Sequence, residues 1–150
     1  YDTNRRHMET LGYDCTLLTD TEVITYIIDF LVRKQGLSLT ETADVIAAPF
    51  WSDIEAMEPE ERERMTYLRN MFSSLLITGP FSILIGFDGG MMALNDRLKL
   101  RSMVCAEKGE AVYFASEECA IRVMEPDVET LWAPRGGQAV VVRLNDGVTV

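Results

Sequence analysis

Asp20 is the residue whose position most suggests chemistry, because it stands in the stretch Thr19-Asp20-Thr21-Glu22 just before a long apolar pattern. Thr19 and Glu22 have the spacing of a capping box, so both are candidate structural residues at a helix start. Backbone N–H groups and the helix dipole would stabilise a charged Asp20 carboxylate there. Two interpretations stay open: Asp20 only supports the helix start, or it holds a ligand.

A second set of charged residues lies beside apolar runs of strand length. Asp96 and Arg97 follow one such run, and Glu117 follows another. Buried charges are costly unless they are paired, so a structural ion pair between Arg97 and Glu117 is the favoured interpretation. Ser116 has no base near it in the sequence, which favours a strand-end or helix-cap hydroxyl over a nucleophile.

Self-contained catalytic sets are missing from the sequence. It has no Gly-rich phosphate loop, no HExxH and no nucleophile elbow. Three cysteines at 15, 105 and 119, without CxxC spacing and with one histidine, give no zinc site and no disulfide framework. Their apolar or strand-like surroundings predict that each is a small buried hydrophobe. We therefore expect no metal site and no catalytic residue in this chain.

Total composition narrows the class of protein further. The 150 residues suffice for one domain with a core, and 47% hydrophobic with 25% charged residues is ordinary for a globular protein. A formal net charge of −10 argues against a nucleic-acid partner. No apolar run is long enough for a membrane span, and no signal-peptide pattern opens the chain. These features predict a soluble, cytoplasmic protein without a membrane partner.

The elements that must position these residues change character near residue 79. Before it, the patterns predict a helix over 3–11, a short strand over 13–18, a helix over 20–34 and an acidic helical insert over about 38–72. After it, apolar runs alternate with turn signals. They predict two hairpins, a short helix over 117–123 and two final strands joined by a turn at 145–147. Strands apolar on both faces need cover on both sides, so the predicted fold class is α+β, with sheets packed inside helices.

Several motifs occur in one order along the chain: TDTEVI at 19–24, GPFSILI at 79–85, LNDRLKLR at 94–101, VYFASEECAI at 112–121 and WAPRGGQAVVV at 132–142. Together they resemble the class II (N-terminal nucleophile) glutamine amidotransferases. The start GYDCTLLTDTEVITY and the acidic insert are most similar to the amidotransferase part of archaeal-type glutamate synthases, which belong to nitrogen metabolism. The resemblance covers roughly 10–30 and 77–145.

The resemblance implies a fold, a reaction and a binding role. The fold is an Ntn-hydrolase-like αββα sandwich of two antiparallel sheets between helical layers. The reaction is glutaminase chemistry: glutamine is hydrolysed to glutamate, and ammonia passes to a synthase domain or subunit. In the family, the aspartate of the TDTEV motif, here Asp20, accepts hydrogen bonds from the α-ammonium of glutamine. Flavin and iron–sulfur chemistry would lie on another chain or domain, so no cofactor is expected here.

The sequence also departs from the family pattern. Residue 1 is Tyr1 rather than a nucleophilic cysteine, no Asn-Gly pair for an oxyanion hole exists, and Cys15 is a poor substitute nucleophile because it has no free amine. We therefore expect 1–150 to be the C-terminal portion of one amidotransferase domain, incomplete at its N-terminus and inactive alone. Sheet edges left open would favour a homo-oligomer. The alternative is a non-catalytic amidotransferase-like binding or interaction module.

Overall fold

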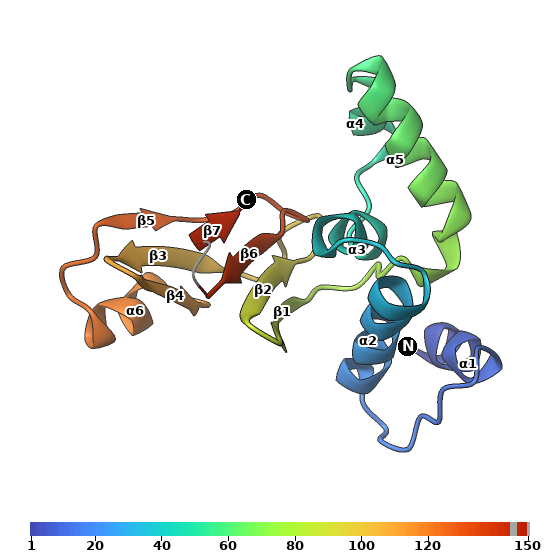
Figure 1. Ribbon diagram of the computed structural model, residues 1–150, viewed down its shortest axis with the longest axis horizontal. Helices are drawn as coiled ribbons and strands as arrows, with labels where there is room; N and C mark the ends of the chain where they lie inside the picture. The colour runs from blue at the N-terminus through green and yellow to red at the C-terminus, as the bar shows by residue number, and fades with distance from the viewer. Residues whose placement is uncertain (145–146, 150) are drawn as a thin grey trace. The chain divides into compact units, whose positions relative to one another are not determined.

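The computed structural model describes residues 1–144 and 147–149, which form two compact units (Figure 1). A helical unit comprises Tyr1–Ile46 and Trp51–Leu76. A sheet unit comprises Ala47–Phe50 and Ile77–Val150. The short link 47–50, between Tyr1–Ile46 and Trp51–Leu76, thus belongs to the sheet unit.

The helical unit contains seven described helical segments, five α-helices, one π-helix and one 3₁₀-helix. They are α1 Asp2–Thr10, α2 Asp20–Asp29, the π-helix η1 Phe30–Lys34, α3 Leu39–Ile46, α4 Trp51–Glu55, α5 Pro59–Met71 and the 3₁₀-helix η2 Ser73–Leu75. The helices predicted over 3–11 and 20–34 are confirmed, as is the helical character of 38–72. The strand predicted over 13–18 is wrong, because this segment is a loop.

Helix α2 runs directly into the π-helix η1 and ends at a glycine. The Gln35 N–H donates to the Phe30 carbonyl at 3.0 Å, a bond across five residues instead of four. The Leu37 N–H then donates to the Leu31 carbonyl at 3.0 Å, while Gly36 lies between them at φ 74°. Only glycine adopts this left-handed conformation without a steric cost, so Gly36 ends the helix as its position predicts.

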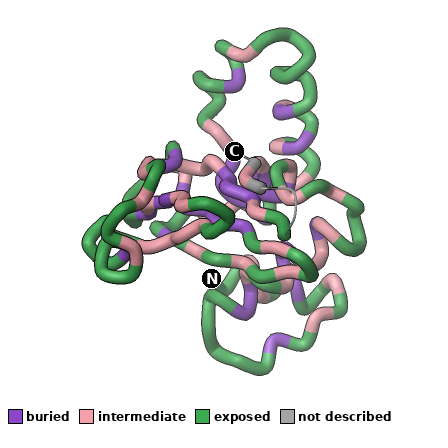
Figure 2. The backbone as a smooth tube through the Cα atoms, turned by 60° about the vertical axis from the view of Figure 1, so that its left-hand side comes forward, coloured by how far each residue is buried: buried purple, intermediate pink, exposed green. Residues whose placement is uncertain are grey.

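The core of the helical unit is built from one apolar face of each helix. Figure 2 colours the backbone by burial, and the buried stretches alternate with exposed ones along these helices. Fully buried large side chains of this unit are Met8, Ile27, Leu31, Ile46, Ile54 and Leu75. Asp44 on α3 and Arg64 on α5 form an ion pair at 3.3 Å between two helices that pack together.

The sheet unit contains seven described strands and one helix. They are β1 Ser82–Phe87, β2 Gly90–Asn95, β3 Val104–Lys108, β4 Ala111–Ala115, α6 Glu118–Met124, β5 Thr130–Trp132, β6 Val140–Arg143 and β7 Gly147–Thr149. One sheet has the order β1-β2-β6-β7 and the other β4-β3-β5, and all pairings are antiparallel. The predicted hairpins are confirmed, whereas β5 is a strand that the sequence pattern did not predict. Of the turn predicted at 145–147, residues 145 and 146 lie outside the described residues.

A shared hydrophobic cluster joins the two sheets. Its buried members come from both of them: Ala93, Met103, Cys105 and Val140, with Phe114, Trp132 and Val148 packed around them. Residues 92–95 of β2 and 140–141 of β6 are accordingly buried. The α+β fold class with two antiparallel sheets is therefore confirmed. Within the described residues, no helix combines the length and apolar character needed to cross a bilayer.

Candidate functional site

The start of α2 presents the carboxylate of Asp20 to solvent. Thr19 is the N-cap residue, and its Oγ1 accepts the Glu22 N–H at 3.3 Å, as the capping-box spacing predicts. Asp20 is the first helical residue and is exposed, and its Oδ1 accepts the N–H of Thr21 at 2.9 Å. Among the described residues, no donor reaches its Oδ2. This arrangement leaves a carboxylate oxygen available to a ligand.

Glu22 does not complete the capping box. Its Oε1 accepts the Thr16 N–H at 3.0 Å and the Leu17 N–H at 3.1 Å, and its Oε2 accepts the Leu17 N–H at 2.9 Å. The Thr16 hydroxyl adds a longer contact of 3.4 Å to Oε1. Glu22 is 9% exposed, so its carboxylate holds the loop before the helix from a nearly buried residue.

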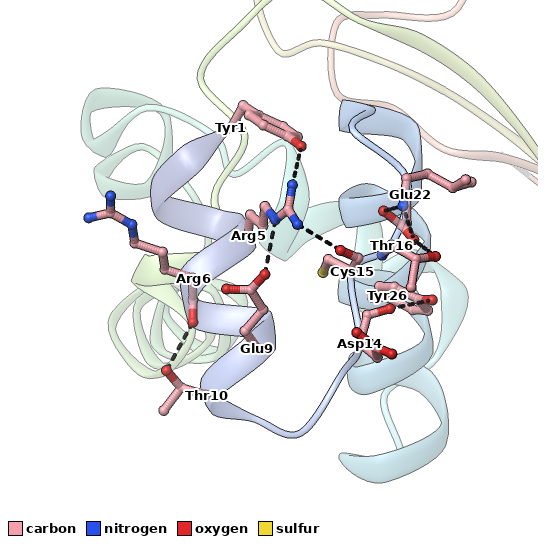
Figure 3. A network of polar contacts seen from close by, with 11 residues as sticks. Tyr1, Arg5, Arg6, Glu9, Thr10, Asp14, Cys15, Thr16, Glu22 and Tyr26 are labelled. Carbon is pink, nitrogen blue, oxygen red and sulfur yellow. Dashed lines mark hydrogen bonds and ion pairs between the residues drawn. The ribbon is translucent and has the colours of Figure 1, made fainter.

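The carbonyls of Asp14 and Cys15, just before Thr16 in the loop, also accept hydrogen bonds from side chains (Figure 3). Arg5 on α1 donates from Nη2 to the Cys15 carbonyl at 2.7 Å, and the Tyr26 hydroxyl on α2 donates to the Asp14 carbonyl at 3.2 Å. Arg5 also donates to Glu9 Oε1 at 2.9 Å, a bond that raises the pKa of the guanidinium above its ordinary value. Side chains thus satisfy the loop backbone that a strand would have paired, which explains why 13–18 is not a strand.

The cysteines differ in exposure, and none resembles an activated nucleophile. Burial, with the nearby Glu22 charge, raises the pKa of Cys15, which is 5% exposed. Burial raises the pKa of Cys105 to about 11. Cys119 is exposed, so the prediction that all three are buried is wrong for it. Its thiol donates to Glu117 Oε2 at 3.3 Å, and this bond raises the pKa of Cys119. A thiolate is the reactive form, so each shift lowers reactivity.

In the sheet unit, Asp96 organises the turn after β2. Its carboxylate is 3% exposed and accepts four backbone N–H groups at 3.0–3.3 Å, from Phe81, Leu98, Leu100 and Arg101. Burial alone would raise the pKa of Asp96, but these four hydrogen bonds together lower it. Asp96 is therefore a charged structural residue whose partners are backbone amides.

Arg97 is not paired with Glu117, so the predicted ion pair is wrong. Its guanidinium donates to the Ala48 carbonyl at 3.2 Å and lies 4.5 Å from the centre of the Phe50 ring. Glu117 is exposed and accepts from Cys119 instead. The physical reason is that Arg97 finds an acceptor and an aromatic face in the link 47–50, nearly fifty residues earlier in the chain.

Two glycines, Gly136 and Gly137, pack against the backbone of Arg97 and Ala47 and form a corner with them. A side-chain carbon at Gly136 would lie 2.4 Å from the Arg97 carbonyl oxygen, and one at Gly137 would lie 3.0 Å from the Ala47 carbonyl oxygen. The Gly137 N–H also donates to the Asn95 carbonyl at 3.2 Å. The WAPRGGQ and LNDR motifs therefore meet in space, and the glycine pair allows them to approach.

Ser116 lies between β4 and α6, at the strand end that the sequence predicts. The N-cap residue of α6 is Glu117, and no side-chain hydrogen bond caps this helix, so the hydroxyl of Ser116 is not its cap. The candidate residues therefore fall in two groups: Thr19, Asp20 and Glu22 in the helical unit, and Asp96, Arg97, Ser116 and Glu117 in the sheet unit. Sequence reasoning missed Arg5 and Tyr26, although Arg5 and Glu9 have the spacing of a helical ion pair.

Among proteins similar in sequence to this chain, one is uncharacterised and another has a named activity. No protein-family model matches the chain. An uncharacterised protein of Archaeoglobus fulgidus is 42% identical over 144 residues, covering 96% of this chain and 38% of that protein. An amidophosphoribosyltransferase of Methanocaldococcus jannaschii is 26% identical over 126 residues, covering 84% of this chain and 21% of that protein.

A solved structure has the same fold. The glutamine phosphoribosylpyrophosphate (PRPP) amidotransferase of B. subtilis matches 99% of this chain and 25% of its own, with a TM-score of 0.62 and 19% identity. The chain thus spans well under half the length of each of these proteins. Sequence and fold together support a class II amidotransferase-like domain.

Proposed function

We propose that this chain is part of a glutamine amidotransferase domain and binds glutamine through Asp20. The observation that carries the proposal is the exposed Asp20 carboxylate, with one oxygen unused among the described residues, at the capped start of α2. The fold similarity to a PRPP amidotransferase supports the same class. An ionised carboxylate and an ammonium group form a charge-assisted hydrogen bond, so Asp20 would orient the amino end of the substrate.

Hydrolysis would require residues that the chain does not offer. We propose that 1–150 is the C-terminal portion of a single amidotransferase domain, with 38–72 as an insert, and that a preceding part of the whole protein supplies the nucleophile. The protonated, buried states of Cys15 and Cys105 support this division. The chain alone would then release no glutamate from glutamine, while the whole protein would deliver ammonia to a synthase partner.

Two acceptors for that ammonia have support from different observations. The stretch GYDCTLLTDTEVITY favours a glutamate synthase partner. The two named relatives, an amidophosphoribosyltransferase and a PRPP amidotransferase, favour a phosphoribosyl acceptor. Supplying purified full-length protein with glutamine and either PRPP or 2-oxoglutarate, and following consumption of each acceptor, separates the two. The 2-oxoglutarate arm includes an electron donor such as NADPH or reduced ferredoxin, because conversion of 2-oxoglutarate and ammonia to glutamate consumes two electrons.

The glutamine proposal is tested with Asp20→Asn in the full-length protein. Losing one charge-assisted contact, worth roughly 1.5–3 kcal/mol, raises KM for glutamine about 10- to 100-fold. Glutamate release is the measurement, and Thr21→Ala, which changes the neighbouring exposed residue, is the matched control. An unchanged KM in Asp20→Asn rejects the role of Asp20.

The non-catalytic alternative predicts a different pattern. A binding module would take up glutamine in calorimetry, lose affinity in Asp20→Asn, and release no glutamate even at full length. Glutamate release by the full-length protein that is well above the buffer rate excludes this alternative.

A further inference from the structure

We propose that Glu22 is a positioning residue that sets where the Asp20 carboxylate stands. The inference rests on the glutamine-binding role proposed above for Asp20. It is carried by the use that Glu22 makes of both its oxygens, which neither the capping-box spacing nor the comparisons assign.

A second helix of the same unit shows what an ordinary capping box looks like. At the start of α3, the Ser38 N–H donates to Glu41 Oε2 at 2.8 Å, and the Glu41 N–H donates to Ser38 Oγ at 3.2 Å. At α2, the Thr19 hydroxyl makes its half of the box, but the Glu22 carboxylate reaches past Thr19 to earlier residues. The departure frees Glu22 to organise the loop instead of the helix end.

The loop from 13 to 17 is anchored at every residue by polar contacts. The Tyr13 hydroxyl donates to Asp29 Oδ2 at 2.7 Å, and the carbonyls of Asp14 and Cys15 accept from Tyr26 and Arg5. Glu22 then holds the N–H groups of the last two residues, Thr16 and Leu17 (Figure 3). The Glu22 carboxylate is therefore the last side-chain group that holds the loop before the chain reaches Asp20.

Apolar burial does not hold that segment. The side chains of Leu17 and Leu18 are 61% and 82% exposed, so neither anchors the loop in a core. Only Leu18 lies between the residues bound by Glu22 and the Thr19 cap. The path of the chain into Asp20 is thus set by the hydrogen bonds to Glu22 on one side and by the cap on the other.

Glu22→Gln is the variant that separates positioning from simple helix capping. The side chain keeps its size, but an NH₂ group replaces one oxygen, and a donor then faces the Leu17 or Thr16 N–H. The matched control is Glu41→Gln, which makes the same change in the ordinary capping box of α3. Both variants remove one carboxylate from the first turn of a helix, so a general loss of stability affects both.

The first readout is amide hydrogen exchange in the chain. Glu22→Gln speeds exchange at Thr16 and Leu17 at least about tenfold, whereas Glu41→Gln leaves both amides at the wild-type rate. If Glu22→Gln fails to fold, Glu22→Asp serves as the test variant, because it keeps the charge on a side chain one methylene shorter. Unchanged exchange at both amides in a folded variant overturns the inference.

The second readout is ligand selectivity in the full-length protein, measured as the KM for glutamine and as the inhibition constant of an analogue. Glu22→Gln weakens glutamine binding about tenfold, the loss of one charge-assisted contact, and leaves unchanged the binding of 4-carbamoylbutanoate, the analogue without the amino group. Equal weakening for both ligands means a merely structural role and overturns the inference. Loss of glutamine affinity in Asp20→Asn but not in Glu22→Gln also overturns it while sparing the proposed function. No loss in Asp20→Asn rejects the proposed function itself.

Discussion

Asp96 and Phe81 hold each other by two hydrogen bonds. The Asp96 N–H donates to the Phe81 carbonyl at 2.9 Å, and the Phe81 N–H donates to Asp96 Oδ2 at 3.3 Å. The same carboxylate accepts the N–H groups of the turn that follows β2. One nearly buried side chain thus fixes both the entry into β1 and the exit from β2.

Asp96→Asn will destabilise the sheet unit. An amide offers one acceptor oxygen where the carboxylate offers two, and its NH₂ group faces backbone donors. Loss of charged hydrogen bonds at a buried site costs about 3 kcal/mol in the free energy of unfolding, measured with urea. Asp88→Asn, in the exposed β1–β2 turn, is the control and is expected to change stability by less than about 0.5 kcal/mol. A similar small loss in Asp96→Asn would show that the backbone amides do not depend on its charge.

The stability of the protein will depend on pH through Asp96. Its folded pKa lies below its ordinary value, so its stabilisation is present above the unfolded pKa of about 4. That stabilisation is lost as pH falls through the folded pKa. Between about pH 5 and pH 2, the wild-type unfolding free energy will therefore fall more steeply than that of Asp96→Asn. Parallel curves for the two proteins would contradict the assignment.

Gly136→Ala will cost more stability than the same replacement at Gly79. Its side-chain carbon would meet the Arg97 carbonyl at 2.4 Å, so backbone must move. Overpacking of this kind costs roughly 1–3 kcal/mol, read as a lower urea midpoint. Gly79→Ala meets nothing within 4 Å and serves as the control. Equal midpoints for the two variants would mean that the corner accommodates the extra carbon.

Thiol labelling will distinguish the three cysteines. In the native chain at neutral pH, iodoacetamide will modify Cys119 first, because Cys119 is exposed whereas Cys15 and Cys105 are buried. Mass spectrometry of digested protein locates the label. All three sites will react in urea. Early native labelling of Cys15 would show that the loop at 13–17 opens readily.

We propose that the chain associates through the edge strand β1. This strand, SILIGF, has neither a charge nor a proline, and it forms one edge of the four-stranded sheet. Unprotected edges favour pairing with another copy, so sedimentation will show a dimer or larger species. Leu84→Lys, at a 54% exposed position of β1, will shift the chain toward monomer, whereas Leu98→Lys, at a 56% exposed turn position, will not. A monomer at all concentrations would end this proposal.

Most elements were predictable because their signals are local. Gly12 and Gly36 lie at φ 88° and 74° after the helices that they end, and turn residues mark the hairpins. Strand β5 gave no such signal, because it has three residues and exists through pairing of Leu131 and its neighbours with β3. The segment 13–18 has a strand-like sequence, but the side chains of Arg5, Glu22 and Tyr26 satisfy its backbone, so the predicted strand is wrong.

The candidate site was predictable only in part. Thr19 as the helix cap follows from spacing, and the structure bears it out. The partners of Arg97 could not be predicted, because they lie in the link 47–50 and no periodic pattern joins positions so far apart. The hydrogen bonds from Glu22 to the loop could not be predicted either. The spacing of Thr19 and Glu22 is the same whether the Glu22 carboxylate accepts the Thr19 N–H or the N–H groups of Thr16 and Leu17.

The π-helix η1 makes the length of the segment 20–36 critical. Its bond from Gln35 to Phe30 spans one residue more than an α-helical bond. Deleting a single residue within 30–34 would restore ordinary helical bonding and leave the upstream residues facing as before, because the wider turn absorbs one residue. Homologues that lack this bulge must therefore be aligned with a one-residue gap at this point, and a chimera joined without that gap would aim Asp20 in a different direction.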